Sequence, residues 1–145
     1  MKKLFFALLH RAGLLRLVAW AYRRRAVFLC YHSVTKSPHP APEDPELHTP
    51  LANFAAQLDC LQRHRRVIAL GDYLAARREG RRLPDYSAVL TFDDGTCNFL
   101  TVVAPLLAER GLPAAAFVIT EKAGGRGATA PSGVWTSDDD RRYLS

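Results

Sequence analysis

The residues with the clearest potential for chemistry are Asp93 and Asp94, which follow the apolar run 87–92 and precede Gly95. Burying one unpaired carboxylate is costly, and burying two side by side costs more. We therefore expect a cation to meet them, and a metal ion is the first candidate. Neighbouring side chains on a regular strand point to opposite faces, so both aspartates serve one site only if the backbone turns there, which Gly95 allows. The plain alternative is a loop in which one aspartate caps the next helix.

Short apolar runs that alternate with helical patterns predict an α/β fold with a parallel sheet and right-handed crossovers. Strands are expected at residues 26–31, 67–70, 87–92 and 114–119. In such folds the active residues lie at the carboxyl ends of the strands. His32 directly follows the first of these strands, so we expect it on the same rim of the sheet as Asp93 and Asp94.

Three helices are expected between the strands. The first has Thr49 as N-cap, Pro50 at its first helical position and the apolar stripe Phe54, Leu58 and Leu61. The second spans residues 72–79 and stops at Gly80. The third passes through Val102 and Leu107 to Gly111, with a kink or restart at Pro105. Proline-rich residues 37–45 indicate a loop, as do residues 120–134, and a further helix is expected to begin near residue 135.

Residues 1–25 form a separate segment, predicted as a basic amphipathic helix over residues 3–22 that ends in three arginines. Its apolar run is interrupted too early for an export signal or for a bilayer span, which takes ~20 residues. The helix either lies on an anionic membrane surface or packs against residues 26–145. We expect the protein in the cytoplasm or at the cytoplasmic face of a membrane.

Composition limits the other function classes. The 145 residues have a net charge of +6, which comes mostly from arginine clusters without interleaved aromatic residues or a nucleic-acid-binding module. We therefore expect no nucleic-acid partner. Cys30, Cys60 and Cys97 are too few and too widely spaced for a disulfide framework, which favours reduced thiols. The sequence leaves the oligomeric state open.

Several motifs together resemble the amino-terminal part of a polysaccharide deacetylase of carbohydrate esterase family four. They are Leu29-Cys30-Tyr31-His32-Ser33-Val34, Phe54-Ala55-Ala56-Gln57-Leu58, Val89-Leu90-Thr91-Phe92-Asp93-Asp94-Gly95, Pro105-Leu106-Leu107 and Ala115-Ala116-Phe117-Val118-Ile119. The resemblance implies a partial (β/α) barrel domain over residues 26–145. It also implies a divalent metal ion, zinc as first choice, and removal of acetyl groups from the amino sugars of a polysaccharide. In that family the first aspartate is the general base and the second is a metal ligand, so these roles fall on Asp93 and Asp94.

The chain departs from the family in its histidines. The resemblance implies two further metal ligands in an H-x-x-x-H pair downstream of the aspartates, whereas all five histidines here lie upstream and none form such a pair. His32 is expected to line the site rather than to bind the metal. A full (β/α) barrel takes ~250 residues, so we expect these 145 residues to be a truncated domain with little activity alone.

Two alternatives remain. The first is a catalytically inactive remnant or a membrane-surface module that binds through its basic helix. The second is a phosphatase of the haloacid dehalogenase type, because Asp94-Gly95-Thr96 resembles part of that motif. In those enzymes an aspartate nucleophile stands where this chain has Phe92, which makes the phosphatase the weaker alternative.

Overall fold

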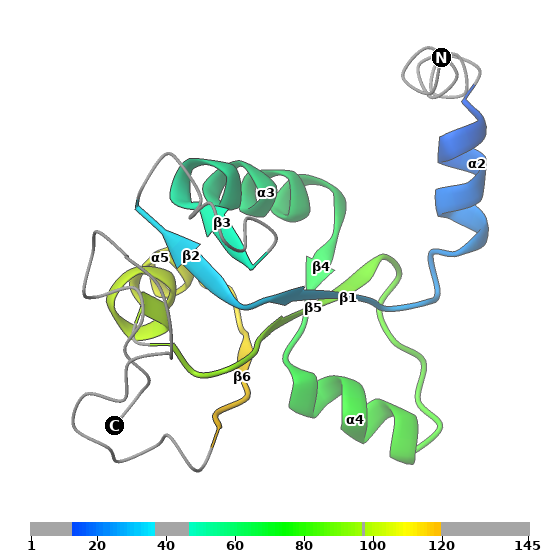
Figure 1. Cartoon of the computed structure of the whole chain (residues 1–145). Helices are drawn as coiled ribbons and strands as arrows, with labels where there is room; N and C mark the ends of the chain where they lie inside the picture. The colour runs from blue at the N-terminus through cyan, green and yellow to red at the C-terminus, as the bar shows by residue number, and fades with distance from the viewer. Residues whose placement is uncertain (1–12, 37–46, 97, 120–145) are drawn as a thin grey trace.

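The computed structural model describes residues 13–36, 47–96 and 98–119, and its centre is a parallel four-stranded sheet (Figure 1). Strand β5 (Ser87–Phe92) pairs along its length with β1 (Val27–Tyr31). Its amino end also pairs with β4 (Arg66–Val67), and its carboxyl end with β6 (Ala115–Ala116). All four strands run parallel, as predicted, so their carboxyl ends point the same way.

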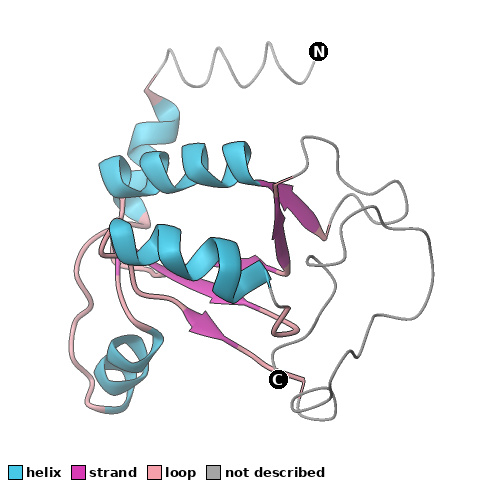
Figure 2. Cartoon of the chain, turned by 90° about the vertical axis from the view of Figure 1, so that its left-hand side faces the viewer, coloured by secondary structure: helices cyan, strands magenta, loops and turns pink. Residues whose placement is uncertain are grey.

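Helices cover both faces of this sheet. Helix α3 (Leu51–His64) and helix α5 (Ala104–Glu109) lie on one side, and α4 (Leu70–Arg78) lies on the other (Figures 1 and 2). All six residues of β5 are buried, which agrees with its continuous apolar run. The alternation of parallel strands and helices confirms the predicted α/β class.

The core forms where α3 and α5 meet the sheet. Phe54 and Leu58 of α3 are fully buried, as their helical spacing predicted, and they pack in one cluster with Leu90 and Phe92 of β5. Tyr31 contacts the Phe54 ring edge-on at 5.1 Å between ring centroids and stacks on Phe92 at 5.4 Å. These aromatic contacts fix the last residues of β1 and β5 against α3, directly before the residues of the rim.

The start of α3 differs from the prediction. Thr49 is not the N-cap but lies in strand β3 (His48–Pro50), which pairs in parallel with β2 (Ser33–Thr35) in a second sheet that was not expected. Pro50 ends β3 and precedes the first helical residue, Leu51. An extended Pro50 fits the end of a strand as well as it fits a helix start, since only its φ is fixed.

Other boundaries moved by a few residues. Strand β4 covers two residues instead of 67–70, because α4 already begins at Leu70, and β6 covers two residues of the expected 114–119. The chain restarts near Pro105 as expected: a π-helical stretch η1 (Phe99–Val103) leads into α5, which carries Pro105 in its first turn. A proline there costs no helical hydrogen bond, because the first-turn N–H groups have no intrahelical acceptor.

Helix α2 (Leu14–Ala21) begins directly after Gly13, whose φ of 71° is not helical. The prediction of one continuous helix over residues 3–22 is therefore wrong, because the helical geometry is broken at residue 13. Residues 1–12, the loop expected at 37–45 and all expectations beyond residue 119 lie outside the described residues. Among the residues that the structure describes, no helix has the length and apolar character needed to cross a membrane. The division of the chain at residue 25 stays a prediction.

Candidate active-site rim

The backbone turns sharply directly after β5. Asp93 still continues the strand, because its N–H donates to the Tyr31 carbonyl oxygen at 2.8 Å. The next two residues, Asp94 and Gly95, have φ values of 68° and 61°, a region that residues other than glycine, asparagine and aspartate rarely adopt. The turn that the two carboxylates need in order to serve one site is therefore present.

Gly95 is required at this turn for a second reason. A Cβ atom on Gly95 would lie 3.0 Å from Cγ1 and 3.2 Å from Cα of Val118, which follows β6. Phe117 N–H donates to the Phe92 carbonyl oxygen at 2.8 Å, so the segment after β6 lies against the end of β5. The absent side chain of Gly95 lets the segments that follow β5 and β6 approach each other closely.

His32 reaches the same rim, as predicted. Tyr31 of β1 pairs with Phe92 of β5, so His32 and Asp93 follow at the same edge of the sheet. Both side chains are half-buried. The placement of His32, Asp93 and Asp94 thus agrees with the sequence, while the roles assigned to them stay predictions.

A polar network that was not predicted holds the rim together. Asn98 is 1% exposed, and its Nδ2 donates to Ser33 Oγ at 2.6 Å. The Thr96 hydroxyl donates to Asn98 Oδ1 at 2.6 Å and also lies 3.3 Å from the His32 carbonyl oxygen. These contacts tie the segment after the aspartates to the segment after β1. The sequence signal for this network was Asn98, a polar residue directly before an apolar helical segment. If such a residue is buried, its side chain needs hydrogen-bond partners.

Cys30 contacts the candidate general base. Its thiol donates to Asp93 Oδ2 at 3.1 Å. Burial, and next the hydrogen bond to Asp93, raise the pKa of the Cys30 thiol above its ordinary value, so the thiol stays neutral at pH 7. Cys30 of β1 pairs with Thr91 of β5, two residues before Asp93, so this contact follows from the pairing of the two strands and could be found only in the structure.

The described residues do not complete a catalytic zinc site. Such a site has three protein ligands, and no three histidine, cysteine, aspartate or glutamate side chains of the part that the structure describes are grouped to hold a metal ion. Asp94 offers one carboxylate. The full sequence adds no H-x-x-x-H pair. The role of Asp94 as a metal ligand therefore stays a prediction.

Comparison with known proteins agrees with the resemblance found in the sequence. Residues 80–135, which contain the Asp93-Asp94-Gly95 turn, match the family model described as polysaccharide deacetylase. No curated protein matches the chain.

Solved structures extend the likeness over most of the chain. A de-N-acetylase from Aggregatibacter actinomycetemcomitans is 19% identical with a TM-score of 0.65, and the match covers 81% of this chain and 47% of that one. IcaB from Ammonifex degensii is 29% identical with a TM-score of 0.60, covering 83% and 44%. The Streptococcus pyogenes deacetylase PplD, solved in complex with acetate, is 23% identical with a TM-score of 0.56, covering 66% and 42%.

This chain spans less than half the length of each of these three structures. The likeness nevertheless includes the α/β fold, and the segment of sequence that matches the family model contains both aspartates. Together these findings agree with the resemblance: residues 80–135 match the polysaccharide deacetylase family model, and the α/β fold of the chain is similar to part of the fold of solved deacetylases.

Proposed function

We propose that this chain is part of a hydrolase that removes acetyl groups from the amino sugars of a polysaccharide. The bond broken is the carbon–nitrogen bond of an acetamide, which is not a peptide bond. The observation that carries this proposal is the turn at Asp94 and Gly95, which sets two adjacent carboxylates at the carboxyl end of a buried parallel strand. The family match over residues 80–135 supports the same reaction.

Asp93 is the proposed general base. Its carboxylate takes a proton from the water that attacks the acetyl carbon. The carbon–nitrogen bond then breaks, acetic acid is released, and the same proton goes to the nitrogen of the leaving amino group. A neutral Cys30 thiol that donates to Asp93 Oδ2 leaves the other carboxylate oxygen as the acceptor for this proton. Cys30 thereby limits the orientations open to the base.

Asp94 is the proposed metal ligand. Polysaccharide deacetylases as a family use a divalent metal ion, and zinc is the first choice for this chain. Asp94 is one ligand of the three that a catalytic zinc needs, so further ligands are required beyond the residues described. His32 is proposed to line the substrate side of the rim.

The substrate class is proposed from the family and from the printed descriptions of two similar structures, a de-N-acetylase and a deacetylase bound to acetate. We propose an acetylated amino-sugar polymer. A cytoplasmic location, expected from the sequence, stays a prediction.

The proposal is tested by acetate release from N-acetylated amino-sugar oligomers. The assay uses the longest natural gene product that contains these residues, and zinc is added to it. Asp93→Asn and Asp94→Ala should each lower the rate by about a hundredfold or more, because each removes a group that acts on the reacting atoms. Asp72→Asn, an exposed carboxylate in the first turn of α4, is the matched control and should keep the rate.

Two outcomes decide against the deacetylase. No acetate release by the wild type with any divalent metal favours the inactive remnant, a reading supported by the incomplete ligand set of the described residues. Hydrolysis of phosphate esters instead favours the phosphatase. That reading is opposed by Phe92, which stands at the nucleophile position and packs in the core at 2% exposure.

A further inference from the structure

Helix α2 presents apolar side chains to solvent. Leu14 is 44% exposed, Leu17 60% and Val18 48%. Their spacing places them on one face of the helix, and two half-exposed aromatic residues, Trp20 and Tyr22, stand at its carboxyl end. Several large apolar side chains exposed to solvent on one short helix are typical of a surface that binds a protein or a membrane.

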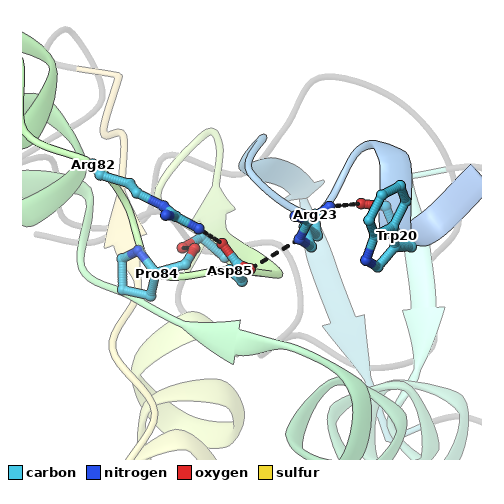
Figure 3. Close-up of polar contacts among 6 residues, drawn as sticks. Trp20, Arg23, Arg82, Pro84 and Asp85 are labelled. Carbon is cyan, nitrogen blue, oxygen red and sulfur yellow. Dashed lines mark hydrogen bonds and ion pairs between the residues drawn. The ribbon is translucent and has the colours of Figure 1, made fainter.

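Arg23, two residues after the end of α2, ties this segment to the domain. Its Nε donates to Asp85 Oδ2 at 3.1 Å, and its backbone carbonyl accepts a hydrogen bond from the Tyr86 N–H. The same guanidinium donates to the Trp20 carbonyl oxygen at 2.8 Å and lies 4.3 Å from the centre of the Trp20 ring (Figure 3). These contacts fix the chain directly after α2 to the domain, while Leu14, Leu17 and Val18 stay open to solvent.

The positive charge of the sequence is concentrated in the segment that contains α2. Residues 1–25 contain seven lysine or arginine residues and no acidic residue, whereas residues 26–145 contain thirteen basic and fourteen acidic residues. Arg16, Arg24 and Arg25 of this segment are exposed. An apolar face flanked by arginines and by interfacial aromatic residues suits a surface that is both apolar and anionic.

We propose that α2 lies on an anionic lipid surface, with Leu14, Leu17 and Val18 entering the interface and the neighbouring arginines meeting lipid phosphates. A second copy of the chain is a poorer occupant, since pairing two α2 helices would set two equally basic segments side by side. The aromatic residues at the end of α2 favour the level of the headgroups.

The position of α2 also orients the domain. Helix α2 precedes β1, whereas the rim that carries His32 follows it (Figure 1). The five residues of β1 separate the two by roughly 16 Å. A membrane that binds α2 therefore lies at the amino ends of the strands, and the Asp93-Asp94 rim opens away from the lipid.

Vesicle co-sedimentation tests this proposal without any reference to catalysis. The probes are vesicles of phosphatidylcholine alone and of phosphatidylcholine mixed with phosphatidylglycerol. The purified protein should sediment with the anionic vesicles, and binding should fall as salt is added. The double substitution Leu17→Asp with Val18→Asp should weaken binding by about tenfold or more, because it removes two apolar side chains that enter the lipid interface when α2 binds. Leu74→Asp, on an exposed position of α4, should bind as the wild type does.

Three results would overturn the proposal. One is no sedimentation of the wild type with anionic vesicles, as expected if another part of the protein covers α2. Another is equal binding by the Leu17→Asp, Val18→Asp variant when circular dichroism shows that it is folded. The third is a dimer in solution that these two substitutions dissociate while vesicle binding is absent, which would make a second copy the occupant.

Discussion

At the scale of single residues, the chemistry of the rim depends on backbone geometry as much as on the carboxylates. Asp93 directly follows β5, and Asp94 and Gly95 have positive φ values that turn the chain. Without that turn, adjacent side chains would point to opposite faces of the sheet. The requirement for a turn could be predicted from the Asp93-Asp94-Gly95 string. The contact of Gly95 with Val118 could not, because it joins segments that are separated in the sequence.

Gly95→Ala tests the close approach at the rim. The substitution places a Cβ within 3.0 Å of Val118 in addition to a positive φ, whereas Gly80→Ala meets the same φ penalty with no atom within 4 Å. We expect Gly95→Ala to lower the free energy of unfolding by about 1–3 kcal/mol more than Gly80→Ala, the usual cost of overpacking. Urea unfolding of the two variants measures the difference, and equal losses would show that Val118 moves aside freely.

At the scale of elements, the sequence predicted which helices and strands exist better than it predicted the residues at which they begin and end. The buried stripe of α3 was read correctly from the spacing of Phe54 and Leu58. The start of α3 and the pairing of β2 with β3 were not, because strands of three residues are too short to show a period. The polar network around Asn98 joins Ser33 of β2 to the segment after β5, 65 residues further along the chain, which is why it could be found only in the structure.

The anchor of α2 makes a prediction at this scale. The hydrogen bond from Arg82, followed by the charges of Arg82 and Arg23, lowers the pKa of Asp85, although burial opposes the shift. The ion pairs of Asp85 therefore stabilise the attachment of α2 above the ordinary carboxyl pKa, and this stabilisation is lost as the pH falls through the lowered value. Asp85→Asn should remove it at every pH.

Hydrogen–deuterium exchange of the α2 amides, corrected for the intrinsic rate at each pH, measures this effect. Asp85→Asn should speed exchange in α2 at pH 7, and the wild type should approach the variant only below about pH 4. Asp72→Asn serves as the control and should leave α2 unchanged. Identical exchange in the wild type and in Asp85→Asn at pH 7 would show that Arg23 does not hold α2 through Asp85.

At the scale of the whole molecule, the alternation of strands and helices predicted the parallel sheet, and comparison with solved deacetylases agrees with it. The order of the strands in the sheet could not be predicted, because the hydrophobic period of a strand does not determine its neighbours. In the structure β5 has β1 on one side, and β4 and β6 share its other side. A complete ligand set could not be predicted either, since the sequence supplies the two aspartates without the histidine pair.

The separate roles of the two aspartates are tested most directly by zinc titration calorimetry. The titration uses the longest natural gene product that contains these residues and compares it with its Asp93→Asn and Asp94→Ala variants. Loss of a ligand should weaken zinc binding by about a hundredfold or more in Asp94→Ala, whereas Asp93→Asn should bind zinc nearly as the wild type does. Equal loss of zinc affinity in both variants, or no zinc binding by the wild type, would contradict the division of the pair into base and ligand.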